Sequence, residues 1–205
     1  HYSPPLMKYP TQIPPKKRFF ANLLAFHSVH DFYVEEIESA ELVKPMLDRM
    51  QQIYKQGMAA TKSAWLLNEP CIYAKLGKFY RGIVKSKNMN MCDVFLVDKG
   101  EIVPCVQTMF VLLEEFSKIP TLAIHCCTHI PNQSPIDNTT NIKLRQIMRK
   151  NILFCTQIQT DEHLSTTDVI PVKIGVTKPI ENLLNDQSSN NDDQMDVDDL
   201  QAYFG

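Results

Sequence analysis

Residues 71–104 read CIYAKLGKFYRGIVKSKNMNMCDVFLVDKGEIVP. Short runs rich in β-branched and aromatic residues alternate here with small polar clusters, a pattern typical of strands separated by turns. The stretch therefore predicts three short strands joined by tight turns.

The preceding segment predicts strands and then a helix. Residues 19–37 indicate two strands with a break near 27–31. Pro45 suits only the first turn of a helix or a kink, so we expect the next helix to begin there and to stop near Gly57. Apolar residues then recur at helical spacing: Leu42, Met46, Met50, Ile53 and Tyr54.

The segment after residue 106 predicts mixed structure. Residues 107–119 are apolar at near-helical spacing and end at Pro120. Further predicted elements are a strand at 121–130, a helix at 141–150 capped by Asn138, Thr139 or Thr140, strands at 152–159 and 169–176, and a short helix from Pro179.

Composition indicates an ordinary globular protein. The apolar fraction is 44% and the charged fraction 21%, and no apolar run reaches the roughly 18 residues of a membrane helix. The six cysteines lack C-x-x-C spacing, which suits thiols in a reducing compartment. Residues 1–18 carry five prolines and predict an extended leader, whereas the last twenty residues hold six acids without Lys or Arg and predict a flexible acidic tail.

Several short sequences together resemble the Tudor domain family. They are Cys71-x-x-Ala74-Lys75, Phe79-Tyr80-Arg81-Gly82, Val94-Phe95-Leu96-Val97-Asp98-Lys99-Gly100-Glu101, Ile119-Pro120 and Ala123-x-x-Cys126. With strands and a helix on either side, the chain resembles the extended Tudor module over about residues 19–184. The resemblance implies a mainly β fold with helices (α+β), in which an SH3-like five-stranded Tudor barrel is inserted in a staphylococcal-nuclease-like OB fold.

The implied domain boundaries follow from this resemblance. Residues 19–64 would form the first nuclease-like part, residues 65–130 the Tudor barrel with its linker helix, and residues 131–184 the second nuclease-like part. Residues 1–18 and 185–205 would flank them as leader and tail.

Family members hold dimethylarginine with four aromatics and an Asn, and most of these positions differ here. The first aromatic position falls at Leu76, the second is retained as Tyr80 and the third falls at Leu96. In the family's D-Y-G-N stretch, which reads Asp98-Lys99-Gly100-Glu101 here, Tyr is replaced by Lys99 and Asn by Glu101. A cation over an aromatic face is worth about 0.5–2 kcal/mol, so losing three faces predicts weak methylarginine binding.

Glu101 has two interpretations. Together with Asp98 it would bind unmethylated guanidinium through parallel hydrogen bonds, with Tyr80 and Leu96 beside the arginine stem. Alternatively, Glu101 is a solvated turn acid paired with Lys99, and Tyr80 is an ordinary barrel residue.

No other pattern predicts chemistry. His125, Cys127 and His129 would share a strand face but lie too far apart along a straight strand to surround zinc. We expect no cofactor, no metal and no enzymatic activity. The pI of about 6.3 is far from the strongly basic values typical of nucleic-acid-binding domains, so we do not expect RNA as the main ligand.

The resemblance implies a scaffold module of germline piRNA biogenesis and transposon silencing in cytoplasmic perinuclear granules (nuage). Its expected partner is the N-terminal Arg-rich peptide of a Piwi-clade Argonaute, bound without methylation, alongside other piRNA-pathway proteins and without a membrane. One alternative is an architectural self-association domain whose acidic tail masks the peptide groove; weak RNA binding by the OB-like half is another. Self-association through other parts of a parent protein is compatible with either.

Overall fold

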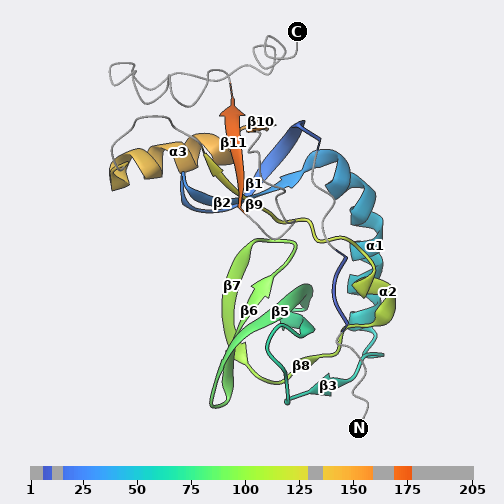
Figure 1. The fold of residues 1–205 in the computed structure, drawn as a ribbon. Coiled ribbons are helices and arrows are strands. Elements are labelled where there is room, and N and C mark those ends of the chain that lie inside the picture. Colours follow the sequence, from blue (N-terminus) through green and yellow to red (C-terminus); the bar gives the residue numbers. More distant parts are fainter. Residues whose placement is uncertain (1–6, 11–15, 129–135, 159–168, 177–205) are drawn as a thin grey trace. The chain divides into compact units, whose positions relative to one another are not determined.

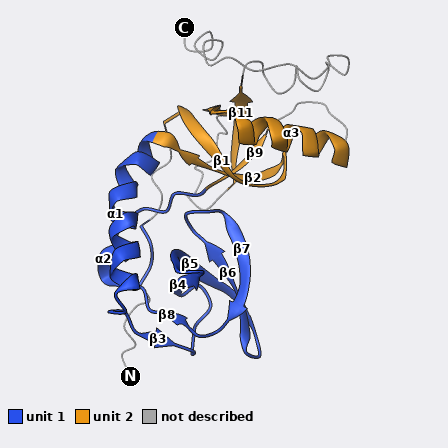
Figure 2. Ribbon diagram, turned by 180° about the vertical axis from the view of Figure 1, so that it is seen from behind, with its two compact units in different colours: residues 1–13, 38–123 blue, residues 14–37, 124–205 orange. Residues whose placement is uncertain are grey.

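The computed structural model describes residues 7–10, 16–128, 136–158 and 169–176. The chain divides into two compact units, residues 1–13 with 38–123, and residues 14–37 with 124–205 (Figure 2). In the sequence, residues 38–123 of the first unit are therefore inserted between the two segments of the second unit. The fold is mainly β with helices, as the sequence predicts.

The second unit is a closed five-stranded barrel. Its strands are β1 (Arg18–Ser28), β2 (Asp31–Glu36), β9 (Ile124–Thr128), β10 (Leu153–Gln157) and β11 (Ile170–Gly175). They close in the order β1-β10-β11-β9-β2, with β9 and β11 parallel and the other pairs antiparallel. This Greek-key order, with a helix between β9 and β10, is that of an OB fold.

Two register shifts in β1 allow this strand to pair with both β2 and β10. Its register against β2 shifts between Leu23 and Ala25 and again between Phe26 and Ser28. Such bulges increase local twist and bend a strand, so this 11-residue strand also pairs with β10 and closes the barrel. Alternate residues such as Phe32 and Val34 then fill the interior.

Helix α3 (Asn138–Lys150) covers the barrel core with Leu144 and Met148. It begins three residues earlier than predicted, and its cap is Asp137 instead of Asn138, Thr139 or Thr140. The Asp137 carboxylate accepts the Thr140 backbone N–H at 2.7 Å, and this hydrogen bond lowers the pKa of Asp137. The carboxylate also suits the positive end of the helix dipole.

The first unit is built on a six-stranded sheet; Figure 1 labels its strands except β4, which Figure 2 labels. The strands follow the order β3 (Thr61–Lys62), β8 (Met109–Phe110), β4 (Pro70–Lys75), β5 (Lys78–Asn88), β6 (Met91–Leu96) and β7 (Glu101–Val106). Residues 71–104 thus span four strands, where the sequence predicts three. The turn between β5 and β6 contains Met89, which takes a φ of +52° in place of a glycine.

Gly82 allows β5 and β6 to approach closely. A Cβ atom at this position would lie 2.4 Å from Val94 Cγ1 and 3.3 Å from the Phe95 carbonyl oxygen. No side chain fits at the first of these distances without a shift, which explains a glycine in the middle of a strand.

Helix α1 (Ile37–Lys55) starts eight residues before Pro45, contrary to prediction. Its buried face is formed by Val43, Met50 and Tyr54, whereas the predicted core residue Leu42 is 76% exposed. The helix ends as predicted, because Gly57 follows it with a φ of +72°.

Helix α1, predicted as part of the segment 19–64, lies almost entirely in the first unit. Its buried residues share one core cluster with Ile72, Phe79 and Phe116. The Gln51 amide fixes it further: it donates to the Phe79 carbonyl at 2.6 Å and accepts the Phe79 N–H at 2.9 Å.

Residues 107–119 are not one near-helical segment. They form β8 and, after an extended stretch, the four-residue helix α2 (Glu114–Ser117). The Tyr54 hydroxyl holds this stretch extended, since it donates to the Val111 carbonyl at 2.7 Å and accepts the Leu113 N–H at 3.0 Å.

The remaining predicted strands are present as β9, β10 and β11. The predicted helix from Pro179 and the acidic tail lie outside the described residues. Within the described ranges, no helix has the length and apolar character needed to cross a membrane.

Candidate functional site

The predicted site residues come from one end of the six-stranded sheet. Because β4 to β7 are consecutive antiparallel neighbours, the β4–β5 and β6–β7 turns lie at the same end. Leu76 is in the first turn, and Lys99 is in the second. We call this the turn end of the sheet.

The β4–β5 turn is a two-residue hairpin loop in which Leu76 and Gly77 both have positive φ, +51° and +74°. Positive φ at both positions defines a type I′ turn, which matches the twist of the strands but strains a residue with a Cβ. The Leu76 side chain is 93% exposed, so a large apolar group stands in solvent at the turn end.

The strand register places Tyr80, Leu96 and Glu101 on one face of the sheet. Leu96 pairs with Gly82 on one side and with Glu101 on the other, and Tyr80 lies two residues from Gly82. Residues two apart on a strand, and residues directly opposite each other, point to the same face. The strand pairing thus places on one face three residues that are up to 21 positions apart in the sequence.

Only some of these side chains are accessible. Tyr80 is partly exposed and packs against Tyr73, with ring centroids 6.1 Å apart. Leu96 is only 4% exposed and belongs to the sheet core. Leu96, predicted to lie beside a ligand arginine, thus fills the core of the six-stranded sheet.

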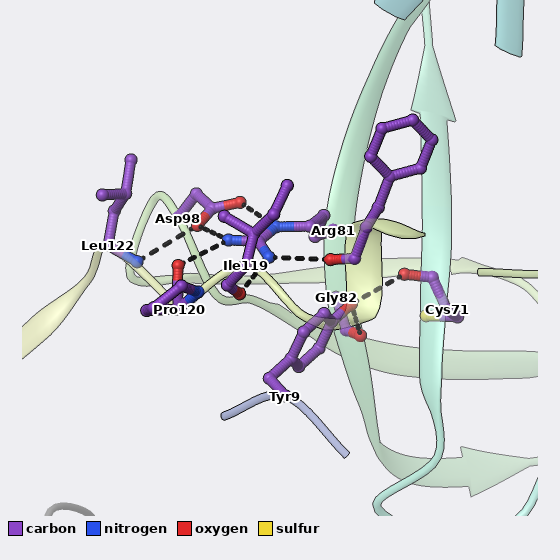
Figure 3. Close-up of polar contacts among 9 residues, drawn as sticks. Tyr9, Cys71, Arg81, Gly82, Asp98, Ile119, Pro120 and Leu122 are labelled. Atoms are coloured by element: carbon purple, nitrogen blue, oxygen red, sulfur yellow. Dashed lines mark hydrogen bonds and ion pairs between the residues drawn. The ribbon is translucent and has the colours of Figure 1, made fainter. Parts of the chain in front are cut away.

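Arg81, on the opposite face of β5, is the most deeply buried charged residue described, with 1% exposure. Its Nε and one Nη donate to the two Asp98 carboxylate oxygens at 2.8 and 2.6 Å. The other donors reach three carbonyl oxygens, those of Phe116 and Ile119 at 3.1 and 2.6 Å and that of Pro120 at 3.0 Å (Figure 3). All five N–H groups of the guanidinium have acceptors, which is what a buried arginine requires.

Two further contacts complete this Arg81 network. The Tyr9 ring lies 5.1 Å from the guanidinium carbon, and its hydroxyl donates to the Gly82 carbonyl at 3.1 Å. Burial raises the pKa of Tyr9 well above its usual value, and the Arg81 charge opposes this rise. The leader residue Tyr9 is thus part of the first unit.

Asp98 is consequently occupied by the protein itself. Besides binding Arg81, its Oδ1 accepts the Leu122 N–H at 3.1 Å (Figure 3). Asp98, predicted to help hold a ligand arginine, thus has both carboxylate oxygens bonded to groups of the chain itself. Sequence reasoning missed Arg81, although one signal was present: a single arginine among the apolar residues of a predicted strand, Phe79-Tyr80-Arg81-Gly82-Ile83.

Lys99 and Glu101 are both exposed. Among the residues that the structure describes, the recorded ion pairs include none between them. The alternative interpretation, a turn acid paired with Lys99, lacks this contact. Lys75 and Lys78 on the adjacent hairpin are exposed as well, so three lysines and one glutamate stand at the turn end.

The His-Cys cluster of the second unit forms other contacts. His125 Nε2 lies 2.6 Å from Asp31 Oδ1, and the His125 ring stacks on Tyr33 with centroids 4.3 Å apart. His129 lies outside the described residues. Across the described ranges, His, Cys, Asp and Glu side chains form no group arranged to hold a metal ion.

Comparisons with known proteins agree with this architecture. The Tudor domain family model matches residues 13–130, and the chain belongs to the Tudor domain family. No curated protein sequence matches the chain.

Solved extended Tudor domains share the fold at low sequence identity. The human TDRD1 extended Tudor domain, in complex with a symmetrically dimethylated peptide, aligns with a TM-score of 0.73 and 12% identity over 88% of this chain and 93% of that one. Domain TD3 of mouse TDRD1, in complex with a MILI peptide containing dimethylarginine 45, aligns with a TM-score of 0.71 and 16% identity over 88% of this chain and 95% of that one. Tudor in complex with a dimethylated Aubergine peptide aligns with a TM-score of 0.68 and 17% identity over 82% of this chain and 98% of that one.

Proposed function

We propose that the chain is a non-catalytic peptide-binding module that recognises an arginine-containing peptide at the turn end without requiring arginine methylation. The observation that carries this proposal is Glu101, an exposed carboxylate on the same sheet face as Tyr80 and with no recorded ion pair to the described residue Lys99. A carboxylate meets an unmodified guanidinium with two parallel hydrogen bonds, and methyl groups block that arrangement.

The loss of aromatic groups supports independence from methylation. Of the four aromatic positions of the family cage, Tyr80 alone is kept, and its recorded ring contact among the described residues is with Tyr73. Leu76 is exposed but has no π face to offer a cation. A methylated guanidinium would thus find little of the cation–π attraction that a complete cage supplies.

The proposed partner is the N-terminal Arg-rich segment of a Piwi-clade Argonaute, and the proposed setting is piRNA-guided transposon silencing in cytoplasmic germ granules. The support is the extended Tudor fold together with the MILI and Aubergine peptides held by two structural neighbours. The incomplete cage also resembles that of the first extended Tudor domain of Krimper, a likeness that belongs to this proposal.

Titration with two matched peptides tests the proposal. A fluorescent Arg-rich peptide and its symmetrically dimethylated form are titrated with the protein, and we expect the unmodified peptide to bind at least as tightly. Glu101→Gln keeps the shape of the side chain but removes its charge. It should lower the affinity for the unmodified peptide about fivefold, since an exposed charge pair is worth at most about 1 kcal/mol.

The same substitution at an exposed position of α1, Glu41→Gln, is the matched control and should leave both affinities unchanged. Tight binding of the dimethylated peptide alone would refute the proposal. An equal response to both substitutions would remove Glu101 from the site.

A second candidate rests on the lysines of the turn end. Lys75, Lys78 and Lys99 are all exposed, and the six acids of the last twenty residues carry the complementary charge. The chain would then be an architectural, self-associating domain whose tail masks the site. Deleting residues 186–205 distinguishes the two: masking predicts tighter peptide binding after deletion, and an unchanged affinity rejects it.

A further inference from the structure

Sulfur atoms gather in the core of the six-stranded sheet. Cys71, Cys92 and Met109 are buried in one cluster, and Cys105 packs against it. The Cys92 and Cys105 Sγ atoms are 3.5 Å apart, and Cys105 Sγ is 3.7 Å from Met109 Sδ. All six cysteines are free thiols in this structure.

The strand register selects one pair from this cluster. Cys92 on β6 lies directly opposite Cys105 on β7, and the ladder around them has no bulge. Directly opposed residues of an antiparallel pair have Cα atoms about 4.5–5.5 Å apart, inside the range of about 4.4–6.8 Å that a disulfide spans. Cys71 instead faces Gly82 on β5, and it has no such partner.

Access to the two thiols is unequal. β7 is an edge strand of the sheet, and Cys105 is partly exposed on it. Cys92 is buried, with 3% exposure. An oxidant from solvent therefore meets Cys105 first, and Cys92 is already in contact with the sulfur that has reacted.

We propose that Cys92 and Cys105 form an oxidative modification site, at which a hydroperoxide converts the two thiols into a cross-strand disulfide. In the first step the Cys105 thiolate attacks the peroxide O–O bond; with hydrogen peroxide this gives a sulfenic acid and releases hydroxide, which takes up the thiol proton as water. In the second step Cys92 sulfur attacks the Cys105 sulfur, the S–S bond forms and a second water leaves. Two thiols are oxidised by two electrons, and one peroxide is reduced to two waters.

The site is a slow one at neutral pH. Burial, and then the hydrogen bond with Cys92, raise the pKa of Cys105 to about 12. The reactive thiolate is thus scarce at pH 7, and its amount rises about tenfold per pH unit until the pKa is reached. The proposed disulfide would record lasting oxidative conditions and would not respond to brief ones.

The disulfide would close a loop that contains the β6–β7 turn and thus both Lys99 and Glu101. It would also fix the edge strand to its one neighbour. The bond would form whatever ligand the turn end binds, so its test is independent of the proposed function.

The linkage is measured by mass spectrometry on the full chain. Folded protein is incubated with excess hydrogen peroxide at pH 8 for several hours, the remaining thiols are blocked with N-ethylmaleimide, and trypsin is added. Cleavage after Lys87, Lys99 and Lys118 places Cys92 in peptide 88–99 and Cys105 in peptide 100–118. We expect these two peptides to be linked, and dithiothreitol to separate them.

Thermal unfolding provides a second readout. The closed loop should raise the melting temperature of the oxidised protein by about 5–10 °C over the reduced protein. Cys105→Ala should abolish this shift, and the matched control Cys71→Ala, which removes a thiol of the same cluster, should keep it. Blocked free thiols at Cys92 and Cys105, a link to Cys71, or oxidation to separate sulfinic acids would each overturn the proposal.

Discussion

Replacing Asp98 with Asn tests whether the Arg81 network holds the first unit together. The substitution keeps the side-chain shape but removes the charge opposite a guanidinium whose side chain is fully buried. Asn offers one acceptor oxygen where Asp98 offers two, and its amide N–H groups would face an Arg81 donor. One buried donor thus loses its partner, and the arginine charge loses its counterion.

The expected cost follows from this geometry. Removing one partner of a buried ion pair typically costs about 3–5 kcal/mol, and Asp98 is only 11% exposed, so solvent screens the pair little. We expect the free energy of unfolding of Asp98→Asn to fall by about that amount. The three carbonyl groups that bind Arg81 lie at residues 116–120, so this segment should loosen with it.

Urea denaturation followed by tryptophan fluorescence measures this loss. The chain has one tryptophan, Trp65, which is buried in the first unit and donates to the Gln107 carbonyl at 2.7 Å, so the signal reports that unit alone. Asp93→Asn is the matched control, because its partner Ser86 donates to Asp93 and can still donate to Asn; its cost should stay below about 0.5 kcal/mol. A loss below about 1 kcal/mol for Asp98→Asn would show that the buried pair is not what holds the unit.

Two other substitutions test the packing. Gly82→Ala places a methyl group 2.4 Å from Val94 Cγ1; it should cost about 1–3 kcal/mol in urea denaturation, and adding Val94→Ala should recover part of that loss. Tyr54→Phe should cost about 1–3 kcal/mol at pH 7, because it removes hydrogen bonds to Val111 and Leu113. Burial raises the pKa of Tyr54 from 10.0 to about 12, so its stabilisation is complete below pH 10 and is lost as the pH rises towards 12; the difference between wild type and Tyr54→Phe should shrink over that window.

Strands and their approximate limits were predictable where a short apolar run is bounded by polar residues, as in β2 and β10. The helix α1 was harder, because Pro45 normally marks a first turn. Leu42 fits the helical spacing of the later residues, but Pro45 outweighed that signal, and the anchor that fixes the helix, Gln51 against the Phe79 backbone, joins residues 28 positions apart. The helical prediction for residues 107–119 was wrong for a related reason. Their conformation is set by the Tyr54 hydroxyl of α1 and not by the spacing of their own apolar residues.

The residues of the candidate site were predictable only through the family resemblance, and then unevenly. The resemblance located Tyr80, Lys99 and Glu101 at accessible places of the turn end. It did not show that Leu96 is buried in the sheet core or that the Asp98 carboxylate is bound to Arg81. Burial and internal pairing depend on distant parts of the chain, such as the carbonyl groups of residues 116–120, and alignment to a short pattern does not reveal them.

Under the proposed function, the residues that hold the sheet differ from those that contact the peptide, and this separation makes a final prediction. Arg81, Asp98 and Gly82 hold the sheet, whereas the exposed side chains of Lys99 and Glu101 make no recorded hydrogen bond or ion pair with the described residues. Lys99→Tyr combined with Glu101→Asn restores two family positions and should leave the free energy of unfolding within about 0.5 kcal/mol of wild type. One added aromatic face is worth about 0.5–2 kcal/mol to a cation, so the affinity ratio of dimethylated to unmodified peptide should rise about 2- to 30-fold. An unchanged affinity ratio in a stable double variant would mean that the turn end does not contact the peptide's arginine.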